Sequence, residues 1–335
     1  MITFLKKFRK NYFYLRVAQS PTYFNLAKFL RARGWRSARF NWRADFGERN
    51  FQFNQQVAEQ LEFKHLLAQL VSQYCPQIMP VTYCINDQNW ATILQQVSDK
   101  YYARDHQLQD QVDGLLWILK PALLNNGQNI KIFQKLSQLE QHYLSSDRLG
   151  GEHVLQQYVD QPHLLKGHKY SIRMFVVLTT DAGAYLYPHG YFNVAQSPYQ
   201  PNDFTNLNPH LTNEHLHEDA ANVIQIPTQR FDFFPELFEK ITKIVTEVAS
   251  ALQQMYPQFL HSRAGGNPSN PLAIFGFDFL VDANKHVWLL EANHGPCFPV
   301  DPNHPLQKYL YDEFWQAFID SFVLPIAERK FIFVG

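Results

Sequence analysis

Hydrophobic positions along the chain repeat with two different periods. Apolar residues at helical spacing predict one amphipathic helix at residues 236–255 and another at residues 306–322. Short apolar runs predict strands at residues 115–120, 153–159, 169–178, 184–187, 274–281 and 286–292. Because strands outnumber helices in the second half of the chain, we expect an α+β fold with a largely antiparallel sheet.

Polar residues interrupt the last two predicted strands. If the chain turns at residues 283–286, Asp278 lies opposite Glu291 and Gly276 lies opposite Asn293, all on one face of the sheet. The other face is expected to enter the core, with Phe275, Phe277, Phe279 and Val281 on one strand and Trp288, Leu290 and Ala292 on the other.

Two opposed carboxylates destabilise a strand pair unless a positive charge lies between them. Carboxylate and amide oxygens are the hard ligands that magnesium takes, usually with phosphate oxygens completing its shell. We therefore predict that Asp278, Glu291 and Asn293 hold magnesium beside a phosphate. The alternative is that one carboxylate pairs with a basic side chain or points to solvent.

Basic side chains suited to a phosphate lie on other predicted strands. Lys169, Ser171 and Arg173 alternate along one strand and share a face, while the residues between them face the core. Lys120 ends another apolar strand, just before a loop whose Gly127 permits a close approach to phosphates.

The motifs WILKP, VLQQYV, KYSIR, HLTN, FGFDFLVD and LLEANHGP follow one another along the chain. In order and spacing they resemble the tubulin–tyrosine ligase family, a branch of the ATP-grasp ligases, and ARFNWRADFGERNFQFN resembles that family's amino-terminal region. The resemblance implies an ATP-grasp fold. It comprises a small basic α/β domain for substrate recognition at residues 1–57, a central subdomain at 58–150, and a carboxyl-terminal antiparallel-sheet subdomain with the nucleotide site at 151–335.

The resemblance also implies roles for particular residues. The implied ATP-binding set is Lys64, Lys120, Gln156, Gln157, Tyr158, Val159, Lys169, His210, Thr212 and Asn213, in which residues 156–159 form the hinge beside adenine. Arg173, Lys169 and Asn213 are implied to act at the reacting phosphate. The implied magnesium ligands are Asp278, Glu291 and Asn293.

The chain departs from the family pattern at four positions. Gln157 stands where lysine is frequent, Ser171 where aspartate is usual, Asn193 where an arginine commonly faces the reacting groups, and Asn129 in place of a second loop glycine. We expect these changes to affect the choice of acceptor more than the binding of ATP.

Other features bear on metal chemistry and location. Three cysteines without CxxC spacing argue against a disulfide framework or a cysteine zinc site. His215, His217 and Glu218 suggest a zinc alternative, although their spacing matches no strong metal pattern. With no signal-like stretch and no apolar run of about 18 residues, we expect a soluble, cytoplasmic protein without a membrane partner.

Charge is unevenly distributed along the chain. The net charge is zero, yet residues 1–50 hold 12 Lys and Arg against only Asp45 and Glu48, so they carry +10. Such a region attracts anionic partners, including an acidic peptide tail. We do not expect nucleic acid to be the main partner, because the region is predicted to lack the interleaved aromatics of an RNA-binding motif.

The resemblance implies an ATP-dependent ligase. It joins a free amino acid to a carboxylate of an acidic, tubulin-like protein or peptide tail through an acyl phosphate, with ATP and Mg²⁺ as cofactors. Three alternatives stay open: a nucleotide-binding protein without ligase activity, a glutamate or glycine ligase with another acceptor, and a nucleic-acid-binding protein.

Overall fold

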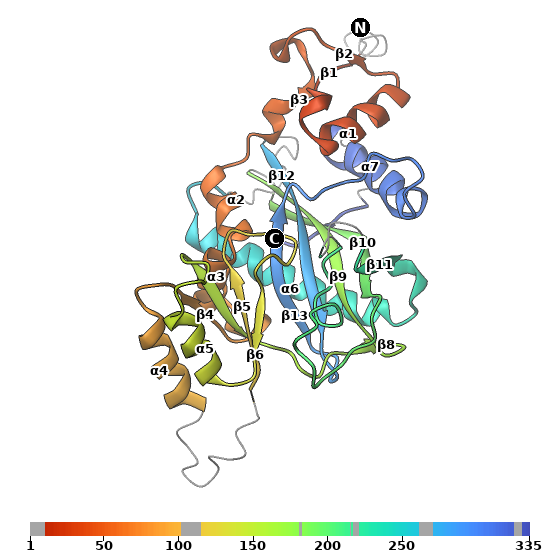
Figure 1. The fold of residues 1–335 in the computed structure, drawn as a ribbon. Helices are drawn as coiled ribbons and strands as arrows, with labels where there is room; N and C mark the ends of the chain where they lie inside the picture. The colour runs from red at the N-terminus through yellow and green to blue at the C-terminus, as the bar shows by residue number, and fades with distance from the viewer. Residues whose placement is uncertain are drawn as a thin grey trace, which may run out of the picture.

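The computed structural model describes residues 11–101, 115–180, 183–214, 216, 221–260, 271–324 and 330–335. In these segments, helices pack on antiparallel sheets and on a small parallel sheet, so the predicted α+β class is confirmed (Figure 1). None of the described helices is both long and apolar enough to cross a membrane. The predicted surface loop at residues 261–271 lies almost wholly outside the described residues.

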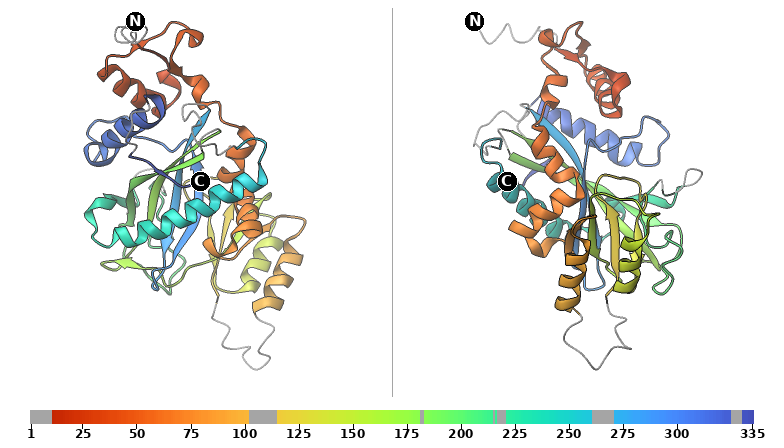
Figure 2. Two further views of the ribbon diagram at one scale, coloured as in Figure 1. Left: turned by 180° about the vertical axis from the view of Figure 1, so that it is seen from behind. Right: turned by 60° about the vertical axis from the view of Figure 1, so that its left-hand side comes forward.

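A large antiparallel sheet forms the main body. Its path runs through β11 (Val223–Pro227), β10 (Gly183–Ala195), β9 (His168–Thr179), β12 (Leu272–Val281) and β13 (Val287–His294), and the short strands β8 (Leu164–Leu165) and β14 (Ile332–Phe333) pair with β9 and β10. Helix α6 (Phe234–Met255) crosses one face, close to the predicted bounds (Figure 2). The helices α2 (Gln55–Glu62) and α3 (Lys64–Tyr74) share the core on that face.

A smaller antiparallel sheet lies beside the large one. Its order is β4 (Thr82–Ile85), β7 (His153–Gln157), β5 (Trp117–Pro121) and β6 (Lys131–Phe133). The helices α4 (Trp90–Tyr101) and α5 (Leu136–Leu144) lie against this sheet, where Trp117, Leu119 and Leu155 are buried. Because side chains alternate along a strand, Ile118 and Lys120 point to the opposite face, toward the large sheet.

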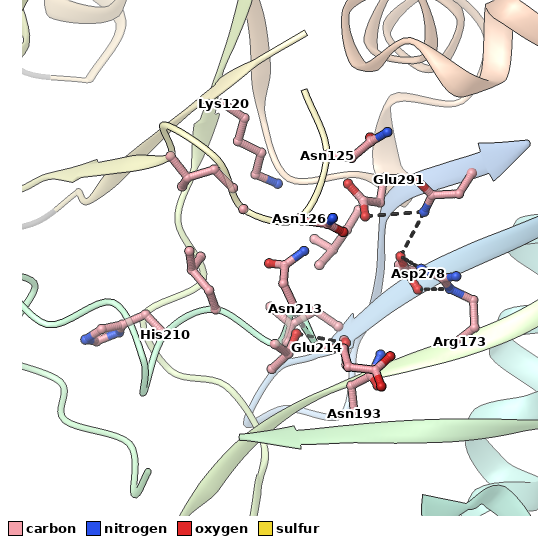
Figure 3. A pocket seen from close by; sticks show the side chains of 18 of the residues that line it. Lys120, Asn125, Asn126, Arg173, Asn193, His210, Asn213, Glu214, Asp278 and Glu291 are labelled. Carbon is pink, nitrogen blue, oxygen red and sulfur yellow. Dashed lines mark hydrogen bonds and ion pairs between the residues drawn. The ribbon is translucent and has the colours of Figure 1, made fainter. Parts of the chain in front are cut away.

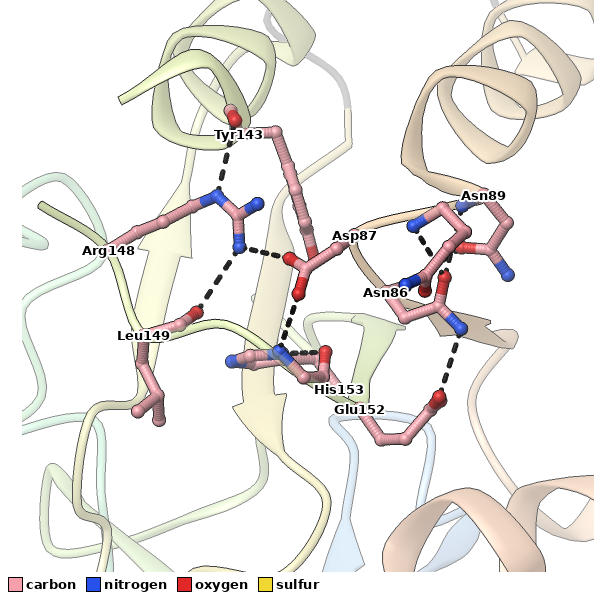
Figure 4. A network of polar contacts seen from close by, with 10 residues as sticks. Asn86, Asp87, Asn89, Tyr143, Arg148, Leu149, Glu152 and His153 are labelled. Atoms are coloured by element: carbon pink, nitrogen blue, oxygen red, sulfur yellow. Dashed lines mark hydrogen bonds and ion pairs between the residues drawn. The ribbon is translucent and has the colours of Figure 1, made fainter. Parts of the chain in front are cut away.

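A polar network holds the segment that leads into β7 (Figure 4). Arg148 forms an ion pair with Asp87, whose carboxylate also accepts the Gly151 N–H at 3.0 Å. Glu152 accepts the amide N–H of Asn86 at 2.9 Å. These contacts tie the start of β7 to the turn between β4 and α4. The position of β7, and of the residues that follow it, is therefore held relative to the smaller sheet.

The amino-terminal residues form a small unit at one end of the molecule. Strand β1 (Tyr12–Tyr14) pairs in parallel with β2 (Arg36–Ser37) and β3 (Phe46–Gly47), and α1 (Pro21–Ala32) packs on α7 (Asp312–Phe318) (Figure 1). Five-residue π-helical turns flank α7, at Gln307–Tyr311 and Ile319–Val323, which gives the second predicted helix its length. Division of the chain at residues 57 and 150 stays a proposal.

The basic amino-terminal unit has exposed aromatic side chains beside its arginines. Phe40 and Trp42 are exposed, at 44% and 69%, and their rings stack with centroids 6.2 Å apart. The guanidinium groups of Arg39 and Arg43 lie over these two rings, at 5.4 and 4.5 Å. Aromatic and basic side chains therefore lie next to one another on this exposed surface, although the sequence shows no RNA-binding motif here.

Candidate active site

A cavity of about 520 Å³ is lined by both antiparallel sheets (Figure 3). All the residues that the sequence assigned to ATP, magnesium or catalysis line it, from Lys64 through Asn293. Three of the four departures, Gln157, Ser171 and Asn193, line it as well. Their common placement follows from the predicted strand faces, because Tyr170, Ile172 and Met174 are buried in the core on the other side of β9.

The end of the cavity near the smaller sheet contains two buried lysines. Lys169 donates to the Tyr158 hydroxyl at 2.8 Å, and that hydroxyl lies 2.9 Å from His210 Nδ1. Lys120 donates to Gln156 Oε1 at 2.8 Å. Burial lowers the pKa of Lys169 to about 7, with the charge of Lys120 adding to the effect, and burial lowers the pKa of Lys120 to about 8.

The predicted hinge crosses between the two sheets at this end. The Gln157 N–H donates to the Val81 carbonyl and the Tyr158 N–H to the Leu116 carbonyl, each at 2.8 Å. Both hydrogen bonds hold the hinge backbone against the smaller sheet. The side chains of Gln156 and Tyr158 therefore keep a fixed position beside the lysines.

The loop after β5 covers the cavity. Gly127 has φ +73°, and a Cβ there would lie 3.3 Å from Asn213 Oδ1 and 2.9 Å from Leu216 Cδ1, so glycine permits this close approach. Asn129 has φ +55°, a left-handed conformation that asparagine tolerates better than most residues. The departure from glycine at Asn129 thus keeps the loop conformation that a glycine permits.

The hairpin of β12 and β13 has the predicted register at the polar residues that line the cavity. Asp278 pairs with Glu291 and Gly276 pairs with Asn293. A β-bulge follows, because Phe279 pairs with Leu289 and leaves Leu290 as an extra residue.

The bulge overturns part of the predicted core. One extra residue reverses the alternation of side chains on the turn side of the hairpin. Val287 and Leu289 are buried in the core there, while Leu290 lines the cavity and Trp288 is only partly buried. The assignment of Trp288 and Leu290 to the core was therefore wrong, whereas that of Ala292 and the β12 residues is confirmed.

The carboxylates of Asp278 and Glu291 lie among basic and amide groups. Arg173 binds Asp278 through two nitrogens, and the bond from Nη2 to Oδ2 measures 2.6 Å. Lys64 lies 3.8 Å from Glu291. The alternative that one carboxylate pairs with a basic side chain is thus realised at Asp278.

The two carboxyl groups have opposite pKa shifts. Burial raises the pKa of Asp278 to about 6, although Arg173 opposes this effect. Burial acts in the same direction on Glu291, but Lys64 and Lys120 outweigh it and lower the pKa of Glu291 to about 2. Glu291 is therefore ionised at neutral pH, and Asp278 is mostly ionised.

The arrangement fits a divalent cation. Asn293 Nδ2 lies 3.2 Å from Asp278 Oδ2 and 3.3 Å from Glu291 Oε1, so a partly positive group lies between the two carboxylates. Turning the amide about its last bond presents the oxygen at the same place. In the described parts of the chain, no three His, Cys, Asp or Glu side chains form a metal cluster. Asn293 would add an amide oxygen to the two carboxylates, and phosphate oxygens would complete the shell of magnesium.

Gly276 makes room for Arg173. A Cβ on Gly276 would lie 2.8 Å from Arg173 Cδ and 2.9 Å from its Nη1. The absence of a side chain at this position therefore lets the guanidinium lie flat along β12 and reach Asp278.

The sequence reasoning missed several residues that line the cavity. Tyr191 and Tyr311 lie near Arg173, and Glu214 and Gln225 lie near Asn193. Glu214 directly follows the HLTN motif, and this position is the sequence feature that could have pointed to it. No sequence feature pointed to Gln225, because its place in the cavity depends on the pairing of β10 with β11. The zinc alternative at His215, His217 and Glu218 lies outside the described residues.

Comparison with known proteins agrees with this geometry. The model of the tubulin-tyrosine ligase family matches residues 52–330. The chain belongs to this family. The predicted resemblance and the ATP-grasp-type α+β fold are thereby confirmed.

Relatives within the tubulin-tyrosine ligase family are distant. The chain is 27% identical over 232 residues to a tubulin glycylase of Tetrahymena thermophila, covering 64% of this chain and 22% of that protein. It is 25% identical to a probable tubulin polyglutamylase of Caenorhabditis elegans, covering 59% and 50%. It is 24% identical to a probable tubulin–tyrosine ligase of Saccharomyces cerevisiae, covering 80% and 42%. The chain thus spans half or less of the length of these relatives.

Proposed function

We propose that the protein is an ATP-dependent ligase that joins an amino acid to a carboxylate of a protein or peptide. The observation that carries the proposal is the presence in one cavity of Lys120, Lys169 and Arg173 together with the pair of Asp278 and Glu291. Family membership supports the same chemistry, as do the names of the relatives: a tubulin glycylase, a probable tubulin polyglutamylase and a probable tubulin–tyrosine ligase.

The proposed reaction has two steps. The acceptor carboxylate attacks the γ-phosphorus of ATP to give an acyl phosphate, and the amine of the amino acid then displaces phosphate. Lys120 and Lys169 hold phosphate oxygens, and Arg173 stabilises charge on the transferred group. Asp278, Glu291 and Asn293 are placed to hold Mg²⁺, which supplies charge neutralisation for the phosphates.

The proposed acceptor is an acidic, tubulin-like tail. The exposed arginines of the amino-terminal unit support this, because a basic surface concentrates acidic peptides near the cavity. Ser171 and Asn193 leave room for another acceptor, for a glutamate or glycine ligase, or for a protein that binds ATP without ligation. We propose a cytoplasmic location for the same reaction.

The test measures ADP release with magnesium–ATP, a panel of acidic peptides that includes tubulin tails, and each amino acid in turn. The intact mass of each peptide is then determined. We expect one peptide to gain the mass of an amino-acid residue, and Glu291→Gln to lower the rate by at least about 100-fold through loss of charge at the metal site. Glu236→Gln is the matched control, because Glu236 pairs with Lys240 and Lys285 outside the cavity.

Two results would contradict the proposal. ATP binding without ADP release for any acceptor supports the alternative of a binding protein. Salt-sensitive binding of oligonucleotides that is stronger than binding of acidic peptides supports the nucleic-acid alternative, for which the stacked Phe40 and Trp42 provide a surface.

A further inference from the structure

The floor of the cavity contains two adjacent rows of polar side chains. The first row crosses the sheet through Asp278, Arg173 and Tyr191, which are register partners. The second row lies two residues further along the strands, about 7 Å away. It consists of Ser171, Asn193 and Gln225, and Asn193 pairs with both of the others.

The second row holds Glu214 in place. Gln225 Nε2 donates to Glu214 Oε2 at 3.1 Å and to Asn193 Oδ1 at 3.2 Å. The backbone near Glu214 is fixed as well, because the Glu214 carbonyl accepts the Asn222 N–H at 3.0 Å. The preceding Thr212 donates to Ser171 Oγ at 2.8 Å. Glu214 is thus anchored from both sides of the second row.

The charge of Glu214 reaches the first row. Tyr191 and Tyr311 have raised pKa values mainly because of burial, and Glu214 adds to the increase while Arg173 opposes it. Both tyrosines therefore lie within the electrostatic reach of Glu214 and of Arg173. Glu214 is consequently a neighbour of the place where Arg173 meets the transferred phosphoryl group.

Glu214 differs in role from the other acidic residues of the cavity. Among the described lining residues, the carboxylates are Asp278, Glu291 and Glu214. The first two form the predicted metal site with Asn293, so Glu214 is the one outside it. Glu214 and Asn193 share the amide of Gln225, so a carboxylate lies beside two neutral amide side chains. A carboxylate in such a place attracts a cation.

The second step of the proposed reaction brings a cation to this place. An amine arrives at neutral pH as an ammonium ion, which must be held near the acyl phosphate and must lose a proton before it can attack. A carboxylate with neighbouring amide oxygens suits an ammonium group, which has only donors.

We propose that Glu214, Asn193 and Gln225 form the binding site for the ammonium group of the incoming amine. The inference rests on the proposed function and deepens it. The ammonium group gives one proton to the Glu214 carboxylate, and the neutral amine attacks the acyl carbon. The new C–N bond forms as the acyl C–O bond to phosphate breaks, phosphate leaves with the electron pair, and the second amine proton passes to solvent.

Hydroxylamine separates this inference from the proposed function. It is mostly uncharged at neutral pH, so it traps an acyl phosphate as a hydroxamate without an ammonium site. The experiment compares wild type with Glu214→Gln, using magnesium–ATP and the acidic peptides above. One arm measures ligation of each amino acid by intact mass, and the other measures hydroxamate formation.

For Glu214→Gln we expect kcat/KM for the amino acid to fall by about 10- to 100-fold, the value of a charge-assisted hydrogen bond. Hydroxamate formation and the KM for ATP are expected to change by less than about threefold, which also shows that the variant is folded. Gln225→Leu, which keeps the carboxylate but removes its support, is expected to raise the KM for the amino acid by a smaller factor.

The possible outcomes are distinct. If Glu214→Gln ligates with an unchanged KM and kcat, the inference is wrong and the proposed function stands. If Glu214→Gln lowers the rates of ligation and of hydroxamate formation equally, the inference is also wrong, because Glu214 then acts in the first step. If the wild type forms neither product with any peptide, the proposed function fails and the inference fails with it. Glu236→Gln again serves as the control.

Discussion

At the end of the cavity near the smaller sheet the polar lining includes the buried cations Lys120 and Lys169, whereas around Asn193 and Gln225 it includes amides, hydroxyls and the carboxylate of Glu214. At the first end the two lysines lie where solvent stabilises their charge poorly, and phosphates would stabilise it. The second end carries negative charge and hydrogen-bonding groups. Under the proposed function, the first end is the part that binds ATP and the second is the part that selects the reacting groups.

The largest expected effect tests the cationic end. Lys120→Met removes a charged hydrogen-bond donor and leaves a side chain of similar length, so we expect ATP affinity to fall by about 100-fold. Calorimetric titration with magnesium–ATP measures the change. Lys243→Met is the matched control, because Lys243 lies exposed on α6. Equal affinity of the two variants would remove the basis for calling this end the nucleotide site.

The two ends also differ in what the sequence reveals. Lys169, Ser171 and Arg173 alternate along a single strand, so their common face follows from the period of two. The pairing of Asp278 with Glu291 follows from one short turn. These local rules predicted the nucleotide and metal side chains correctly as a cluster, although their roles stay proposals.

The remaining features depend on contacts that local rules do not determine. The bulge at Leu290 changes which residues of β13 face the core, and nothing in its apolar run indicates where the extra residue lies. Glu214 and Asn193 both accept a hydrogen bond from Gln225 on the neighbouring strand. The pairing of β10 with β11 spans a connection that no short motif predicts. The end that contains Glu214 can therefore be recognised only in the folded structure.

A second test concerns the junction between the two ends. In Gly276→Ala the new Cβ would contact Arg173 at less than 3 Å, so the Arg173 side chain must shift and its bonds to Asp278 are expected to weaken. We expect kcat to fall by about tenfold or more, while ATP affinity changes little because Lys120 and Lys169 are untouched. Parallel measurement of the melting temperature checks the fold. A loss of ATP affinity as large as the loss of kcat would contradict the separation of the two ends.

The pH dependence of the two ends is expected to run in opposite directions. Burial lowers the pKa of Lys169 to about 7 and that of Lys120 to about 8, so both lysines lose protons between pH 7 and pH 9. Phosphates favour the protonated lysines, so ATP binding takes up protons, and affinity falls as pH rises through this range. The fall is at most about tenfold per pH unit for each deprotonated lysine.

Titration in buffers of different ionisation enthalpy measures this proton uptake directly. Between pH 7 and pH 8 the attack of the amine is expected to become faster, since more of it is neutral. Saturating ATP separates the two effects, because kcat then reports the chemical steps. An ATP affinity that does not change from pH 6.5 to pH 9 would show that both lysines remain charged without the nucleotide.

The smallest expected effect concerns the basic amino-terminal unit, which is remote from both ends in sequence. Arg39→Glu together with Arg43→Glu reverses two exposed charges that lie over Phe40 and Trp42. We expect the KM for an acidic peptide to rise several-fold at low salt and to approach the wild-type value at high salt, because salt screens exposed charges. ATP affinity and hydroxamate formation at saturating peptide are expected to stay unchanged. A drop in kcat at saturating peptide would instead show that this unit helps to form the cavity. The comparison of the two ends of the cavity would then have to include the amino-terminal unit as a third region.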